Sequence, residues 1–77
     1  MTIKTLQKII DFAEGGKLMS VVADGNVTEF IKHGSFAYDV GADSYSISSA
    51  DGILQVNYGD SNYFFDVKKI STIEFIC

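Results

Sequence analysis

The sequence contains no arginine, no proline and no tryptophan, and its only cysteine is Cys77. A single cysteine cannot form a disulfide within the chain or supply the several thiolates of a structural zinc site. We expect a free thiol in a reducing compartment, with an interchain disulfide or a nucleophile as the alternatives. The sequence also lacks a signal peptide and an apolar run long enough to span a membrane, so we expect a cytoplasmic protein with no membrane partner.

The absence of arginine bears on the partner. The guanidinium group pairs with phosphates and guanine edges through two parallel hydrogen bonds, and nucleic-acid binding needs clustered positive charge. This chain has a formal net charge of −4, which argues against direct nucleic-acid binding. Residues 33–67 contain five aspartates and no lysine. Such an acidic region favours a partner protein with a basic surface. The alternative is that these aspartates only serve turns.

The length limits the core. A chain of 77 residues forms one domain, residues 1–77. A domain near this size buries only about 60% of the surface that its unfolded chain exposes. Because no disulfide can compensate, association with a second copy would bury further apolar surface. The sequence therefore favours a homo-oligomer.

The first segment has the pattern of one amphipathic helix. Thr2 is a candidate N-cap, and Gly15 and Gly16 end the helix. We expect its apolar side to pack on the protein's own sheet, with a partner's groove as the alternative. The apolar residues that recur at helical spacing are Ile3, Leu6, Ile10 and Ala13.

From residue 36 onward, short runs rich in aromatic and β-branched residues alternate with turn sequences. Their spacing predicts an antiparallel β-meander of about five strands. The fold class is therefore α+β: an N-terminal helix followed by the meander. Either the helix or a second layer covers the apolar face of the meander, or the meander curls into a small barrel. The runs are FAYDV, SYSIS, ILQVNY, NYFFDV and STIEFI.

The segment between the helix and this meander is less uniform. KLMSVVADGN predicts a strand that ends in an Asp-Gly turn. Residues 26–35 fit either a second strand or a short helix with Asn26 as its cap, Glu29 three residues later and Gly34 at its end. We favour a helix or an irregular segment there.

The stretch VNYGDSNYFFDV, residues 56–67, predicts a hairpin that contains part of the partner-binding region. Strand alternation places Phe65 inward and Phe64 outward, with Tyr63 near the rim. An exposed aromatic residue beside aspartates is typical of a protein interface. The alternative is that Phe64 packs beneath the helix. The predicted partner-binding residues are Asp39, Asp43, Asp51, Asp60, Tyr63, Phe64 and Asp66.

Residues with catalytic potential are few. His33 is the only histidine, and a relay with Ser35 and Asp39 has no specific spacing to support it. The alternating serines around Tyr45 and Ile47 indicate a solvated sheet face. Signatures of a calcium loop or a phosphate-binding loop are missing. We therefore expect a protein that is not an enzyme and that uses no metal or cofactor.

The C-terminal end of the chain is similar to part of a known family. The stretch FFDVKKISTIEFI resembles the last strands of Sm-like small barrels, in which a helix also precedes five strands. That resemblance implies an oligomeric Sm-like or SH3-like barrel that binds RNA or a small nucleotide, with Lys68 and Lys69 as rim contacts.

In size, acidity, absence of arginine and lack of catalytic groups, the chain also resembles phage-encoded inhibitors of host defence such as anti-CRISPR proteins. This resemblance implies a viral protein in the host cytosol that docks an acidic face on a basic surface of a nucleic-acid-handling defence protein. We take the inhibitor as the first hypothesis and the Sm-like or SH3-like barrel as the alternative.

Overall fold

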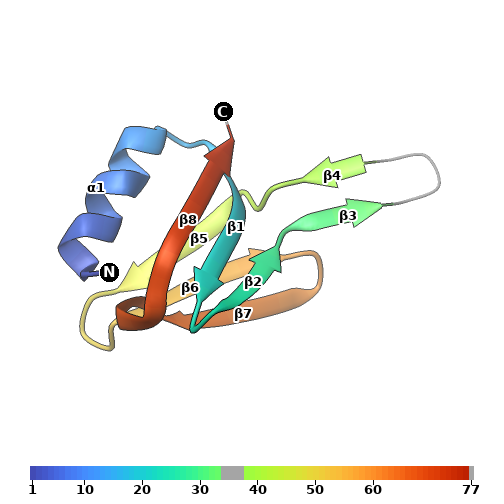
Figure 1. The fold of residues 1–77 in the computed structure, drawn as a ribbon. Helices are drawn as coiled ribbons and strands as arrows, with labels where there is room; N and C mark the ends of the chain where they lie inside the picture. Colours follow the sequence, from blue (N-terminus) through green and yellow to red (C-terminus); the bar gives the residue numbers. More distant parts are fainter. Residues whose placement is uncertain (34–37, 77) are drawn as a thin grey trace.

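The computed structural model describes residues 1–33 and 38–76, and Figure 1 shows one helix beside antiparallel strands. The predicted α+β class is confirmed. The elements are α1 (Ile3–Ala13), β1 (Lys17–Ala23), β2 (Asn26–Glu29), β3 (Ile31–His33), β4 (Tyr38–Val40), β5 (Ser44–Ser48), β6 (Ile53–Tyr58), β7 (Ser61–Asp66), the 3₁₀ turn η1 (Val67–Lys69) and β8 (Ile70–Ile76).

Helix α1 begins and ends as the sequence predicts. The Thr2 hydroxyl accepts a hydrogen bond from the backbone N–H of Thr5 at 3.1 Å and so caps the first turn. After Ala13, the left-handed backbone of Glu14 and Gly15, with φ of 48° and 80°, stops the helix. Leu6 is fully buried in the central core. The apolar side of α1 therefore packs on the protein itself.

The strands are divided among three sheets with the orders β2–β1–β8, β3–β4 and β5–β6–β7. The five predicted runs correspond to β4 to β8, but only β5, β6 and β7 pair consecutively. The last strand, β8, instead returns to pair with β1 (Figure 1). The described strands form open sheets and do not close into a barrel.

Our preference for a helix or irregular segment after Asp24 is wrong over the described residues 26–33. Asp24 and Gly25 form a tight turn in which both residues have positive φ, 56° and 78°. That turn geometry matches the right-handed twist of paired strands, so β2 folds back on β1 and pairing prevails over the helix-capping pattern. Residues 34 and 35 lie outside the described residues.

Two bends in the chain, between β2 and β3 and between β4 and β5, are hydrogen-bonded to β1. At Phe30 the chain leaves β2 for β3; its N–H donates to the carbonyl of Met19 at 2.8 Å, and its carbonyl accepts from the N–H of Gly41 at 2.7 Å. At Gly41 and Ala42 the chain passes from β4 to β5. Leu18 and Ala42 exchange two backbone hydrogen bonds of 2.9 and 2.8 Å. These bonds fix the β5–β6–β7 sheet against β1.

The core lies between the β2–β1–β8 and β5–β6–β7 sheets, and α1 contributes to it from one side (Figure 1). Phe30 is fully buried, and the rings of Tyr58, Tyr63 and Phe65 pack edge-to-face against it with centroid distances of 5.7, 5.2 and 6.4 Å. The core residues are Leu6, Leu18, Val21, Phe30, Ala42, Leu54, Val56, Val67 and Ile70.

Candidate functional site

Two of the predicted partner-binding aspartates lie at one end of the β5–β6–β7 sheet. Asp60 is the second residue of the two-residue turn between β6 and β7. Asp43 directly precedes β5, whose first residue, Ser44, pairs with Asn57 near the end of β6. Both aspartate side chains are exposed. Two carboxylates therefore face solvent around the β6–β7 turn.

The two other aspartates with described side chains lie at the opposite end of the sheet. Asp66 pairs with Ile53 at the beginning of β6, and Asp51 belongs to the turn before it. Asp51 accepts a hydrogen bond from the Ser48 hydroxyl at 3.0 Å, and Asp66 accepts one from the N–H of Lys68 at 3.1 Å. Because β6 spans about 20 Å, the aspartates form two groups and do not share one face. The turn interpretation fits Asp51 and Asp66.

The predicted aromatic residues face opposite sides of the sheet. Tyr63 is partly buried against Phe30, whereas Phe64 is 63% exposed on the outer face. The outward orientation of Phe64 is confirmed, and it does not pack beneath the helix. Asp39 lies in β4, but its side chain, like that of His33, is outside the described part of the structure.

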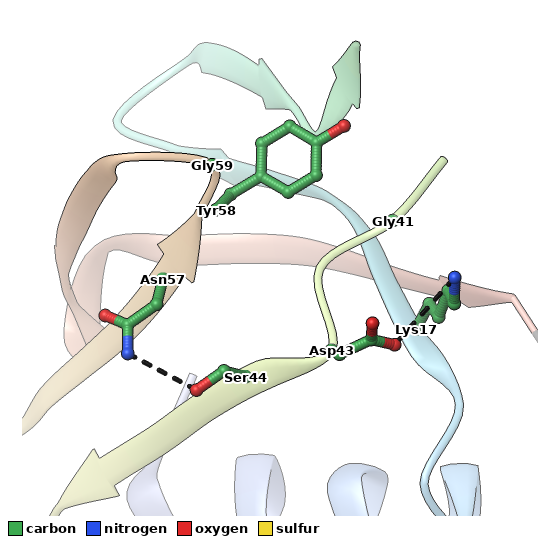
Figure 2. A pocket seen from close by; sticks show the side chains of 7 residues that line it. All are labelled: Lys17, Gly41, Asp43, Ser44, Asn57, Tyr58 and Gly59. Carbon is green, nitrogen blue, oxygen red and sulfur yellow. Dashed lines mark hydrogen bonds and ion pairs between the residues drawn. The ribbon is translucent and has the colours of Figure 1, made fainter. Parts of the chain in front are cut away.

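Two adjoining hollows lie at the end of the sheet that carries Asp43 and Asp60. One has a volume of about 250 Å³ and is shown in Figure 2. The second has a volume of about 360 Å³. Both contain Tyr58 and Gly59 in their walls, so we name the pair of hollows the Tyr58 groove. Its first half is also lined by Lys17, Gly41, Asp43, Ser44 and Asn57, and its second by Ile31, Asp60, Ser61 and Tyr63.

The polar contacts of the first hollow are weak and solvent-accessible. The Lys17 ammonium lies 3.9 Å from the Asp43 carboxylate, and the two side chains are 50% and 77% exposed. The Asn57 amide donates to the Ser44 hydroxyl at 3.3 Å. Figure 2 shows these contacts on opposite sides of the hollow. Exposed ion pairs contribute about 0–1 kcal/mol, so Asp43 can exchange Lys17 for another cation at little cost.

The wall of the first hollow depends on a glycine. Gly41 has φ of +88°, and a Cβ at this position would lie 2.5 Å from the Cβ of Lys17. Any other residue would therefore be strained by its backbone and would also displace Lys17. This close passage of the chain beside Lys17 helps to bring Lys17 and Asp43 together.

Tyr45 lies in β5, two residues after Asp43. Its hydroxyl donates to the carbonyl of Gly16 at 2.7 Å, and its ring packs against Phe75 with a centroid distance of 5.4 Å. Burial, and to a lesser extent the Asp43 carboxylate, raise the pKa of the Tyr45 phenol above its ordinary value of 10.0. Both effects oppose the phenolate form.

The raised pKa of Tyr45 predicts a loss of stability in alkali. The unfolded chain releases the phenol proton near its ordinary pKa, at about pH 10, whereas the folded chain still holds it. The stabilising contribution of the protonated Tyr45 phenol is fully present below that pH. It disappears as the pH rises through the folded-state pKa. In denaturant unfolding at a series of alkaline pH values, Tyr45→Phe should show a smaller pH-dependent loss than the wild type. Equal losses would contradict the prediction.

The described residues give no further chemical centre. Among them, no three or more histidine, cysteine, aspartate or glutamate side chains lie together as metal ligands. No helix in residues 1–33 and 38–76 is long and apolar enough to cross a membrane. The relay considered for His33 and Ser35 falls outside the described side chains, as does Cys77.

Comparison of the chain with protein-family models, curated proteins and solved structures gave no match. The function is therefore inferred from the groove itself. Of the predicted contact residues, the structure brings Asp43, Asp60 and Tyr63 to this groove. Sequence reasoning missed Lys17 and Asn57, which reach the same place from β1 and β6.

Proposed function

We propose that this protein is a non-enzymatic binding protein that docks the Tyr58 groove on a basic surface of a partner protein. The supporting observation is the pair of exposed carboxylates, Asp43 and Asp60, which line the two adjoining halves of one groove. A lysine or arginine of the partner would lie along the Tyr58 side of the groove with its charge between the carboxylates. Complementary charges of this kind steer association and fix its register.

The chemistry of the groove also suggests a class of partner. Proteins that handle nucleic acid present lysine and arginine where phosphates bind. A small acidic protein that occupies such a surface excludes the nucleic acid. We therefore keep inhibition of a host defence protein as the proposed biological role, with docking through Asp43 and Asp60 as its mechanism.

The docking proposal predicts that charge reversal at Asp60 weakens binding of a cationic probe. The probe is a capped tri-arginine peptide, titrated into labelled protein while backbone amide resonances are followed by NMR. The largest shifts are expected around Tyr58, Gly59 and Asp60. In Asp60→Lys, an attractive charge becomes repulsive, so binding should weaken about tenfold or more. Asp51→Lys, an equivalent change at the opposite end of the sheet, should bind as the wild type does.

Two results would count against docking at the groove. One is an equal effect of Asp51→Lys and Asp60→Lys, which would indicate only the overall charge. Another is a set of shifted resonances far from the groove. A capped tri-glutamine peptide serves as the uncharged control, and the arginine titration should weaken as salt is added.

The Sm-like alternative has one supporting observation. Lys68 and Lys69 are adjacent and exposed in η1, although Lys69 lies 3.6 Å from the carboxylate of Asp24. In a gel-shift assay with single-stranded RNA, the docking proposal expects no complex at low salt. A complex that weakens both with salt and in Lys68→Gln would favour RNA binding instead.

A further inference from the structure

β7 is an unprotected sheet edge. Among the described strands it pairs only with β6, and that pairing runs through all six residues without a register shift. Within the described residues, its backbone makes no other backbone hydrogen bond. Its sequence, SNYFFD, contains no lysine and no proline, the residues that commonly prevent an edge from pairing with another strand.

The other edges of the two three-stranded sheets are less suited to pairing. β2 has only four residues and ends in Glu29. β8 has two irregularities in its register with β1, and its first carbonyl, at Ile70, already accepts a hydrogen bond from the amino group of Met1 at 3.0 Å. β5 presents three serines on its outer face. Of the edge strands in the two three-stranded sheets, β7 combines length, regularity and an exposed aromatic ring.

The hairpin fixes which backbone groups of β7 face outward. A two-residue turn is closed by Tyr58 and Ser61, which exchange hydrogen bonds with each other. In an antiparallel pair, bonded and non-bonded residues alternate. The N–H and C=O groups of Asn62 and Phe64 therefore point away from β6 and are oriented to bond another strand.

We propose that β7 pairs with β7 of a second copy of this chain, in a symmetric antiparallel dimer centred on Phe64. In this register Phe64 lies opposite the partner's Phe64, and Asn62 lies opposite the partner's Asp66. Residues that face each other then share a side of the joined sheet, as strand pleating requires. The two exposed phenyl rings cover each other, and each carboxylate meets an amide.

This self-complementarity is the reason for a second copy as the occupant. In the register centred one residue earlier, Phe64 would lie opposite the polar Asn62, so the Phe64-centred register is favoured. The acidic Asp66 side chains of the two copies do not face each other. The proposal does not depend on the docking proposal, because Asp43 and Asp60 take no part in the strand pairing.

The dimer is expected to be weak. One six-residue strand and one phenyl ring from each copy bury less than the roughly 1,600 Å² of a standard interface. The net charge of −4 on each chain also opposes association. We expect dissociation constants on the order of 100 µM and tighter association as salt screens the repulsion. Docking of an arginine peptide has the opposite salt dependence, so failure of one proposal is distinguishable from failure of the other.

Sedimentation equilibrium over about 10 µM to 1 mM tests the dimer. Wild type should shift from monomer to dimer across this range. Phe64→Lys sets two like charges opposite each other and should weaken association at least tenfold. Ser46→Lys is the matched control, because Ser46 is exposed in the same cross-strand row and on the same face, but at the other edge of the sheet. It should associate as the wild type does.

Mixing Phe64→Lys with Phe64→Glu should restore a dimer, because opposite charges then meet at the symmetry axis. Circular dichroism verifies that each variant is folded. In wild type, hydrogen exchange at the Phe64 amide should slow as concentration rises, which tests the pairing without any substitution. A wild type that stays monomeric to 1 mM, or a Phe64→Lys variant that associates like Ser46→Lys, would overturn the proposal.

Discussion

Replacing Phe30 by alanine should lower the free energy of unfolding by about 4 kcal/mol. The side chain is fully buried, and three aromatic rings pack against it edge-to-face. Removing the ring leaves a cavity at the corner where the chain leaves β2 for β3. A domain of this size has a stability of about 4–12 kcal/mol, so the substitution should remove a third or more of it.

Urea unfolding followed by circular dichroism measures this loss. Phe12→Ala is the matched control, because it removes the same atoms from a ring that is 89% exposed. Its stability should change by less than about 0.5 kcal/mol. If the two variants lost similar stability, Phe30 would not be the centre of the core described above.

Gly41→Ala should cost about 3 kcal/mol, from two separate causes. The residue has φ of +88°, which strains any side chain, and its Cβ would lie 2.5 Å from the Cβ of Lys17. To relieve that overlap, the crossing from β4 to β5 must move away from β1. The hydrogen bonds between Ala42 and Leu18 would lengthen, and the first hollow of the Tyr58 groove would change shape.

Gly25→Ala separates the two causes. Gly25 has a similar φ of +78°, but a Cβ there would have no atom within 4 Å. The Gly25→Ala variant should therefore lose only the stability that the backbone strain costs, about 1 kcal/mol. Thermal unfolding of both variants gives the difference, which is the cost of the contact with Lys17. NMR resonances of Asn57 and Tyr58 should shift in Gly41→Ala and not in Gly25→Ala. Equal stability losses would contradict the close approach.

The parts of the fold that depend on local signals followed from the sequence. The N-cap at Thr2, the stop after Ala13 and the hairpin from β6 to β7 each rest on residues a few positions apart. The outward orientation of Phe64 followed from strand alternation alone. Residues 26–29 were misjudged because the sequence there contains both helix-capping residues and a tight turn. The choice between them depends on pairing with β1, which lies outside the segment.

The candidate site was harder to predict. Lys17 and Asp43 meet only because the chain bends at Phe30 and Gly41, and neither bend has a signal in hydrophobic periodicity. The glycine before Ala42 was the one available hint, but a glycine in a turn sequence is too common to indicate a strand corner. The clustering of aspartates in the sequence was also misleading. Asp60 and Asp66 are six positions apart, but they lie at opposite ends of a strand about 20 Å long.

The pairing of β1 with β8 has a consequence for how the chain acquires its structure. The three strands from residue 44 to residue 66 pair only with their neighbours, so they can form as soon as they are synthesised. β1 has to wait for residues 70–76, more than 45 positions later, before its second partner exists. Such distant pairing slows folding, because a long loop must close first. During synthesis, the early β1–β2 hairpin therefore exposes one bonding edge, and a chaperone or a neighbouring nascent chain would meet it there.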